Sequence, residues 1–179
     1  MKYELRTISL DSLEEALSKA QLYRFLNEPE EAESICQDVL AADPENQAAL
    51  RTLGLVITDQ FSGIASDRHT EVKTIFARLS DPYDRHYCLG LLYERRAKAQ
   101  MRAAVPAKAW IPLLHDAMRE FEEAERLRPR GNDEAILRWN RCVRILQGVP
   151  HVISERIEES PLIDEDSAPH EAWRSTRAK

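Results

Sequence analysis

Apolar residues recur along most of the chain at the 3.6-residue spacing that places them on one face of an α-helix. The first such segment predicts a helix over 12–26, with apolar positions at Leu13, Ala16, Leu17, Ala20, Tyr23 and Leu26. Ser12 and Glu15 have the spacing of a capping box, in which each side chain satisfies a free backbone N–H. Pro29 suits the first turn of the next helix, where its missing N–H costs nothing.

The same pattern predicts six further helices. They cover 30–41, 45–59, a segment marked by Val72, Ile75, Phe76 and Leu79, a segment from Tyr87 to about 102, a segment marked by Ala117, Phe121, Ala124 and Leu127, and 132–147. Asp43-Pro44 ends one helix, because the residue before a proline is pushed out of helical geometry. Asp81-Pro82 repeats that dipeptide, and Gly148 with Pro150 is expected to end the last helix.

Composition narrows the class of protein. Only five of 179 residues are glycine, so a turn-rich β-fold is disfavoured, and the net charge of −6 argues against a general nucleic-acid binder. No apolar run approaches the ~20 residues of a membrane helix, and the N-terminus lacks the apolar block of a secretory signal. The three widely spaced cysteines are expected to be buried thiols of a cytoplasmic protein.

The last part of the chain differs in character. Residues 151–179 hold seven acidic and four basic side chains and two prolines. We expect 149–179 to be an acidic, mostly unstructured tail with at most a short helix at 152–159.

Small and aromatic residues repeat at fixed intervals. Leu89-Gly90 and Tyr93 in one predicted helix are followed by Ala117, Phe121, Ala124 and Pro129 in the next. Ala20, Tyr23, Ala32, Cys36, Val39 and Pro44 show related spacings earlier, and Leu53-Gly54 opens a middle copy.

This pattern resembles the tetratricopeptide repeat (TPR) family of helix–turn–helix repeats. The resemblance implies an all-α fold, a right-handed superhelix of about three repeats with a C-terminal capping helix. A lead-in at 1–11 would precede a repeat domain at 12–148, with units at 12–44, 45–82 and 83–129 and a cap at 132–147.

Two units depart from the family pattern. In the middle unit, Thr70 and Thr74 stand at the small and aromatic places, and only Ala77 and Pro82 match. The third unit is longer, with an insertion at about 103–114 that contains Trp110 and Ile111. That segment is either a projecting apolar contact or a lengthened, kinked helix with Trp110 packed inside.

The resemblance also implies that the first helix of each unit lines a concave face. Partner-binding residues would then be Arg24, Arg51, Leu55, Tyr87, Leu91, Arg95, Asn140 and Arg144. Arginines in such a groove can grip a carboxylate of an extended or helical peptide. The alternative is that they only pair with Glu14, Asp59, Asp84 and Glu94 on neighbouring helices.

The sequence favours a non-enzymatic adaptor that binds a protein or peptide partner, with no cofactor or metal. A structural subunit that associates with itself through its terminal helices or tail is the alternative. A weaker alternative is an enzyme with a site near His69, which has Asp67 and Glu71 close in sequence. No glycine-rich phosphate loop, nucleophile elbow or two-histidine helical zinc motif supports that alternative.

Overall fold

The described part of the chain is all helical. The computed structural model describes residues 3–62 and 68–158, with side chains described as far as residue 149, and it contains no strand within those ranges. The chain divides into two compact units, Met1–Gln147 and Gly148–Lys179. The all-α class predicted from the sequence is therefore confirmed for the described residues.

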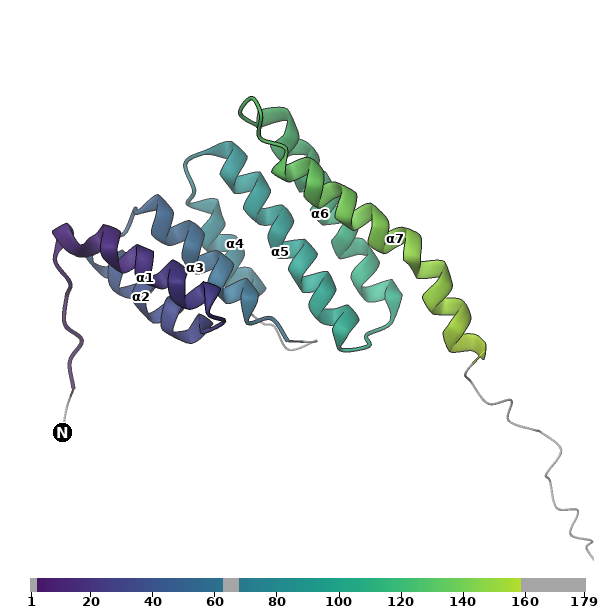
Figure 1. Cartoon of the computed structure of the whole chain (residues 1–179), viewed down its shortest axis with the longest axis horizontal. Helices are drawn as coiled ribbons and strands as arrows, with labels where there is room; N and C mark the ends of the chain where they lie inside the picture. The colour runs from purple at the N-terminus through teal and green to yellow at the C-terminus, as the bar shows by residue number, and fades with distance from the viewer. Residues whose placement is uncertain (1–2, 63–67, 159–179) are drawn as a thin grey trace, which may run out of the picture. The chain divides into compact units, whose positions relative to one another are not determined.

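Seven α-helices and one 3-10 helix follow one another along the described chain (Figure 1). They are η1 (Leu10–Ser12), α1 (Leu13–Phe25), α2 (Pro29–Ala42), α3 (Gln47–Asp59), α4 (His69–Ala77), α5 (Pro82–Arg102), α6 (Ala107–Leu127) and α7 (Glu134–Glu158). From α1 to α6, each helix packs on the next, and α3 also contacts both α1 and α5. The odd-numbered helices therefore lie side by side, as hairpins stacked in sequence require.

The starts of the helices follow local chemistry, with one exception. Pro29 opens α2 as predicted, Asn46 caps α3 by accepting from the Ala49 N–H at 3.0 Å, and Asp81 caps α5 by accepting from the Tyr83 N–H at 2.9 Å. The capping box predicted at Ser12 is wrong. Ser12 already has near-helical backbone angles after η1, and its hydroxyl instead donates to the Ser9 carbonyl at 2.8 Å.

The two Asp-Pro dipeptides act at opposite ends of helices. Asp43 lies just after α2 in an extended conformation, so Pro44 belongs to the turn before α3. Asp81 instead precedes α5, and Pro82 is the first residue of that helix. The sequence motif repeats, but the turn that it makes does not.

Two glycines let helices approach closely in the core. A Cβ on Gly54 would lie 2.2 Å from Cε1 of Phe76, and a Cβ on Gly90 would lie 2.4 Å from Cε1 of Phe121. Both phenylalanines are fully buried. Each ring therefore fills the space left by a glycine on the preceding helix of its hairpin.

This packing corrects the predicted alignment of the middle unit. Thr70, Thr74 and Ala77 are all exposed, so they do not occupy core positions. Phe76 takes the aromatic place two residues after Thr74. The sequence pattern had marked Phe76 as an apolar position of this helix, although the repeat alignment put Thr74 at the aromatic place.

The insertion of the third unit mainly lengthens two helices. α5 and α6 each have 21 residues, joined by a short turn in which Ala104 has a φ of 56°. Pro112 lies inside α6 rather than ahead of it. In the second turn of the helix its missing N–H leaves one backbone carbonyl unpaired, and that carbonyl belongs to the exposed residue Lys108.

The predicted end of the last helix was wrong. α7 continues through Gly148 and Pro150 to Glu158, so the short helix expected at 152–159 is its continuation. A glycine costs a helix about 1 kcal/mol and a proline about 3 kcal/mol, so neither forbids it outright. Residues 149–158 are thus helical, not unstructured, whereas the remaining tail residues, 159–179, lie outside the described part.

The described helices set one further bound on the fold. None of them is long and apolar enough to cross a membrane. Within the compact unit Met1–Gln147, the residues of α7 that are buried in the core are Ala135, Cys142 and Ile145.

Candidate functional site

A charged network joins α1, α3 and α5. Arg24 on α1 pairs with Asp59 on α3, with 2.5 Å between Nε and Oδ2, and Arg95 on α5 pairs with the other oxygen of the same carboxylate at 2.6 Å. Arg95 also donates to the Leu55 carbonyl at 2.9 Å and to the Thr58 hydroxyl at 2.5 Å. Burial lowers the pKa of the Arg95 guanidinium, and the Asp59 carboxylate opposes that effect.

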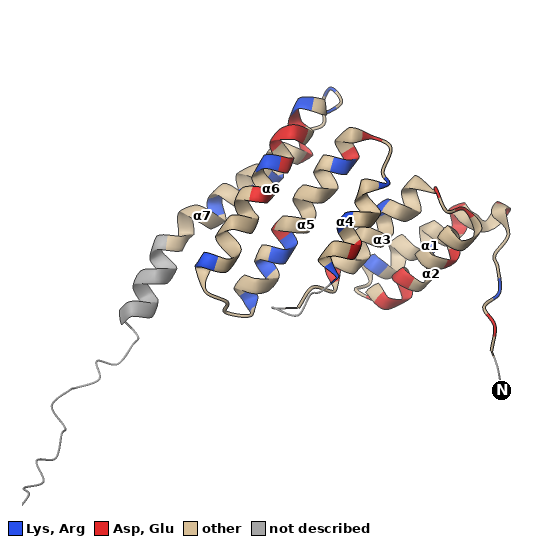
Figure 2. Cartoon of the chain, turned by 180° about the vertical axis from the view of Figure 1, so that it is seen from behind, with Lys and Arg blue, Asp and Glu red and all other residues tan. Residues whose placement is uncertain are grey.

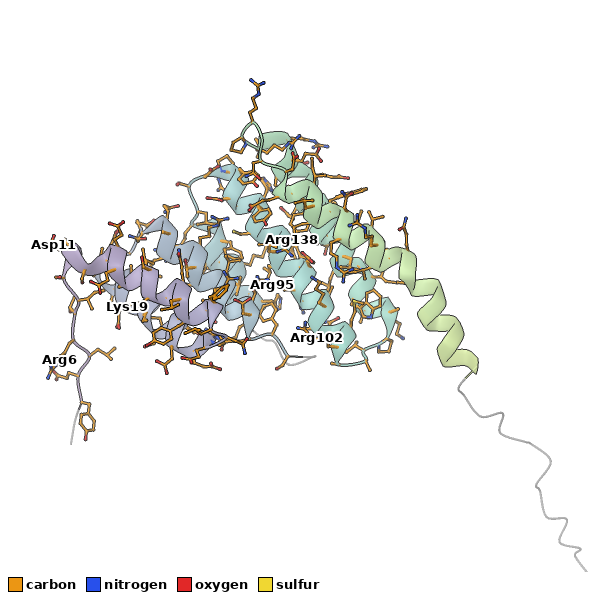
Figure 3. All side chains as sticks on the ribbon, viewed as in Figure 1. Arg6, Asp11, Lys19, Arg95, Arg102 and Arg138 are labelled. Carbon is orange, nitrogen blue, oxygen red and sulfur yellow. The ribbon has the colours of Figure 1, made fainter. Side chains whose placement is uncertain are left out.

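A second, looser pair lies further along the same helices. Arg51 on α3 has its Nε 3.7 Å from Oδ1 of Asp84 on α5. Three of the four predicted groove arginines, Arg24, Arg51 and Arg95, therefore pair with the two aspartates named in the alternative interpretation. Figure 3 shows Arg95 among the side chains between the odd-numbered helices. Arg24, Arg51 and Arg95 thus form the ion pairs with neighbouring helices that the alternative interpretation expected.

The helices α3, α5 and α7 enclose a pocket of about 600 Å³. Its walls are Arg51, Tyr83, Asp84, Gly131, Asn132, Asp133, Glu134 and Leu137. A second pocket of about 350 Å³ is lined by Tyr87, Glu134, Leu137, Arg138 and Arg141. The two pockets are neighbours that share Glu134 and Leu137, and we call them together the α7 groove.

The α7 groove combines apolar and charged walls. Leu137 is 65% exposed although it lies in a hollow, so its side chain is available to a ligand. Arg138 and Arg141 flank it, and Asp84, Asp133 and Glu134 supply the opposite charge. Figure 2 shows both charges near the start of α5 and mainly basic residues toward its end. Charges of both signs beside an apolar residue suit a peptide better than a simple ion.

Two stacked tyrosines form the floor of the α7 groove. The rings of Tyr83 and Tyr87 lie 5.8 Å apart with an angle of 8° between their planes, and Tyr87 packs at 53° against Phe121. Burial raises the pKa of both phenols, and the Glu134 carboxylate adds to the effect. Both hydroxyls therefore stay neutral at ordinary pH and remain able to donate a hydrogen bond.

Two buried polar atoms in the wall of the α7 groove have no hydrogen-bond partner among the described residues. They are Nε of Arg51 and the hydroxyl oxygen of Tyr83. A buried donor without a partner costs about 1–3 kcal/mol. Both groups therefore offer hydrogen-bonding capacity that an occupant of the groove can use.

Glu94 anchors α7 to α5 from below the groove. Its side chain is fully buried, its Oε1 accepts from Lys98 Nζ at 2.6 Å, and its Oε2 lies 3.7 Å from Arg138. The Arg138 guanidinium is thereby held at the groove wall by a carboxylate on the neighbouring helix. Its position is fixed by the fold and does not depend on a ligand.

The other predicted site residues lie in different environments. Tyr87 and Arg51 line the α7 groove, and Leu91 is buried in the core. Leu55 and Asn140 are half-buried, and neither lines this groove. Arg144 is exposed and has no ion-pair partner among the described residues.

The inserted segment is packed at its tryptophan. Trp110 is buried, and its indole N–H donates to the Val105 carbonyl at 3.1 Å, while Ile111 is half-buried. Of the two alternatives drawn from the sequence, the structure therefore has the one in which Trp110 is packed inside.

Sequence reasoning missed most of the α7 side of the groove. It placed Asn140 and Arg144 toward the partner, whereas Leu137, Arg138 and Arg141 line the groove. Leu137 follows directly on Ala135 and Ile136, so the sequence carries no signal that separates this exposed residue from its buried and half-buried neighbours.

The region around His69 is a structural ion-pair cluster. Arg68 donates to both oxygens of Glu33 at 2.5 and 2.9 Å, and it also pairs with Glu71 at 2.8 Å. The hydrogen bond from Arg68 lowers the pKa of the Glu33 carboxyl. His69 begins α4 beside this cluster, and Asp67 lies outside the described residues. Within the described residues, no group of three or more metal-ligating side chains occurs.

The three cysteines are buried and unpaired. Burial raises the thiol pKa of Cys36 and Cys142 to about 12 and that of Cys88 to about 11. All three thiols therefore stay protonated and serve as small core side chains, as their apolar neighbours in the sequence predict.

Known proteins provide no family for this chain. It matches no protein-family model, no curated protein and no solved structure in the comparisons made. Its function is therefore argued from the geometry alone.

Proposed function

We propose that the protein is a non-enzymatic adaptor that binds a peptide segment of a protein partner in the α7 groove. The observation that carries this proposal is Leu137, a large apolar residue that is 65% exposed in a hollow with charged walls. Apolar anchors with polar rims are the usual composition of peptide-binding sites.

Stacked hairpins support a repeat architecture similar to the TPR family. The glycine–phenylalanine contacts of α3 with α4 and of α5 with α6 repeat one packing device in two successive hairpins. The odd-numbered helices lie side by side, as the first helices of TPR-like units would. In that arrangement they line a concave face, and α7 would extend the face as a capping helix.

The polar chemistry of the α7 groove suits a polypeptide. Arg51 Nε makes no hydrogen bond beyond its loose ion pair with Asp84, and the Tyr83 hydroxyl makes no hydrogen bond, so backbone carbonyls of an occupant would bond to both. Arg138 and Arg141 would attract an acidic side chain, and Asp84 and Glu134 a basic one. We therefore expect a partner segment that carries an apolar residue flanked by charges of both signs.

The same geometry gives little support to the enzyme alternative. Glu71, the nearest acid to His69 among the described residues, already accepts two bonds from Arg68. A general base needs a free hydrogen-bonding position next to its substrate. The three unpaired thiols suit a reducing compartment, so the proposal places the adaptor in the cytoplasm.

The test uses a random peptide library displayed on phage and selected on the intact chain. Enriched peptides are resynthesised, and their affinity is measured by fluorescence anisotropy. Leu137→Asp should weaken binding about tenfold or more, because a buried anchor commonly supplies over 1 kcal/mol. Leu127→Asp is the matched control, since Leu127 on α6 is 46% exposed and lies outside the groove. Equal effects of the two changes, or no enriched peptide, would contradict the proposal.

A second pair of variants tests the rotation of α7. Arg141 lines the α7 groove, whereas Arg144, three residues further on, is exposed outside it. Arg141→Glu should weaken binding of an acidic peptide several-fold, about 1 kcal/mol, and Arg144→Glu should leave it nearly unchanged. The reverse result would favour the rotation expected from the sequence.

A further inference from the structure

Residues 3–9 form a lead-in segment that contains neither helix nor strand. Leu5 within it is 97% exposed, the highest value among the large apolar side chains of the described residues. The backbone of residues 4–8 makes no hydrogen bond with the backbone of another described residue. A segment with an uncovered leucine and a backbone outside the helical hydrogen bonds has the properties of a peptide ligand.

The two neighbours of Leu5 carry opposite charges. Glu4 precedes it, Arg6 follows it, and both side chains are exposed. The α7 groove is expected to select a segment in which charges of both signs flank an apolar residue. This chain carries such a segment in its own lead-in.

The first turns of α7 present the complementary pattern. Leu137 is 65% exposed, and Glu134 lies three residues before it and Arg141 four residues after it, on the same stripe of the helix. Glu134 and Arg141 are both exposed, and neither forms an ion pair within the described ranges. An apolar residue between two available charges of opposite sign thus faces the α7 groove.

Leu5 cannot reach the α7 groove of its own chain. Ile8 lies in a hollow with Ala16 of α1 and Ile35 of α2, so the lead-in is held to the fold at that point. The three residues from Ile8 to Leu5 span only about 10 Å when fully extended. Both α3 and α5 lie between α1 and α7, and packed helices are about 8–10 Å apart, so α7 is at least about 20 Å from α1. A lead-in that occupies the groove must therefore come from a second copy.

We propose that residues 3–8 of one copy bind in the α7 groove of a second copy and run antiparallel to α7. Leu5 then packs against Leu137 of the second copy. Glu4 pairs with Arg141 at one end, and Arg6 pairs with Glu134 at the other. The proposal rests on the α7 groove being a peptide-binding site, as proposed above.

The spacings of the two segments allow this pairing. Glu134 and Arg141 are about 10 Å apart along the helix, and the Cα atoms of Glu4 and Arg6 are about 7 Å apart in an extended chain. The long side chains bridge the difference. Neighbouring side chains of an extended segment point to opposite faces, so both charges lie at the exposed rim while Leu5 faces the floor.

Fluorescence anisotropy with a labelled peptide of residues 3–9, capped at both ends, tests the contact on the intact chain. The peptide should bind the wild type, and Leu5→Asp in the peptide should weaken binding about tenfold or more. Leu137→Asp in the chain should weaken it to the same extent. Leu127→Asp should leave it unchanged, because Leu127 is exposed outside the groove.

Sedimentation equilibrium of mixed variants tests that the two surfaces belong to different copies. The average mass of the wild type should rise with concentration above the 20.6 kDa of one chain. The Leu5→Asp and Leu137→Asp chains should each stay monomeric, because each lacks one of the two surfaces. Their equal mixture should form one-to-one pairs, since one variant keeps the groove and the other keeps the lead-in. Leu10→Asp is the matched control, because Leu10 is 68% exposed but lies in η1 beyond Ile8, and it should associate like the wild type.

Charge reversal tests the direction of binding. Glu4→Arg in the peptide should weaken binding to the wild type about fivefold, and Arg141→Glu in the chain should restore it. Arg144→Glu should not restore it, because Arg144 is exposed outside the groove.

Three results overturn the proposal. They are a peptide of residues 3–9 that does not bind up to about 1 mM, a Leu5→Asp chain that associates like the wild type, and mixed variants that stay monomeric. If peptides from the random library bind the α7 groove but residues 3–9 do not, this proposal fails and the proposed function stands. If neither binds, both fail.

Discussion

The α5–α6 and α1–α2 hairpins share one plan but are stabilised by different interactions. In α5–α6, Gly90 admits the ring of Phe121, and Tyr83, Tyr87 and Trp110 are buried around it. In α1–α2 the fully buried residues are small, namely Ala20, Ala32, Cys36 and Val39. No aromatic side chain of α1 or α2 is fully buried.

Polar contacts join the N-terminal hairpin to the helices that follow it. Glu33 of α2 is held by both Arg68 and Gln60, and Arg24 of α1 is held by Asp59. Aromatic burial contributes more free energy than partly exposed ion pairs do. We therefore expect the α1–α2 hairpin to open before α5–α6, and the exposed Leu22, Phe25 and Leu26 at the end of α1 agree with this order.

The largest expected difference concerns the free energy of unfolding of two variants, Phe121→Ala and Cys36→Ala. Phe121 and Cys36 stand at matching places in the two hairpins. Phe121→Ala should lower the free energy of unfolding by about 3–5 kcal/mol, because it empties the space beside Gly90. Cys36→Ala should lower it by only about 1 kcal/mol, since one small group is lost. Urea unfolding followed by circular dichroism measures both. Similar costs would show that the two hairpins do not differ in the way argued above.

Gly90→Ala is expected to have a smaller effect on stability, and its sign should depend on whether Phe121 is present. Gly90→Ala should destabilise the protein by about 1–3 kcal/mol, because the added methyl meets the buried Phe121 ring. In the Phe121→Ala background the same change should stabilise by up to about 1 kcal/mol, since alanine is the better helix former.

Gly148 is the matched control for Gly90. It also lies within a helix, α7, but a Cβ there would meet nothing within 4 Å. Gly148→Ala should therefore stabilise the protein by up to about 1 kcal/mol in either background. If Gly90→Ala behaves like Gly148→Ala in the wild type, Phe121 does not require the glycine.

The contrast between the hairpins also explains what the sequence could predict. Gly90 and Phe121 are far apart in the chain, yet both were singled out from the sequence, because both stand on strongly periodic helices with an apolar face. Phe76 was marked as an apolar position, but the repeat alignment put Thr74 at the aromatic place, because spacing along the chain does not show which residue of α4 faces Gly54. The path of α7 through Gly148 and Pro150 was missed because tertiary context outweighs local helix propensity.

The candidate site was less predictable than the core. Arg51 and Tyr87 were named from the first-helix phase and do line the α7 groove, but Arg95 makes only intramolecular contacts among the described residues. Whether an arginine faces a ligand or an aspartate depends on the separation of two helices, and spacing along one chain does not encode that distance. Leu137 was missed for the same reason, since its exposure follows from the rotation of α7.

The smallest expected effect concerns the polar contacts of the N-terminal hairpin and depends on pH. The hydrogen bond from Arg68 lowers the pKa of Glu33 in the folded state below its ordinary value of 4.5. Glu33 therefore stabilises the fold at pH values above that ordinary value, and the contribution is lost as the pH falls through the lowered pKa. Glu33→Gln should cost about 1 kcal/mol at pH 7, and the difference from the wild type should shrink toward zero below about pH 4.

Urea unfolding at several pH values measures this difference without adding salt, which would screen the charges. Glu15→Gln is the control, because Glu15 pairs with Lys19 at the surface and its side chain is 74% exposed. An exposed pair of this kind is worth about 0–1 kcal/mol, so little loss at pH 7 is expected there. A Glu33→Gln cost that stays constant from pH 7 to acid would show that the lost contact is steric. The N-terminal hairpin would then not depend on charge, and its difference from α5–α6 would reduce to the size of the buried side chains.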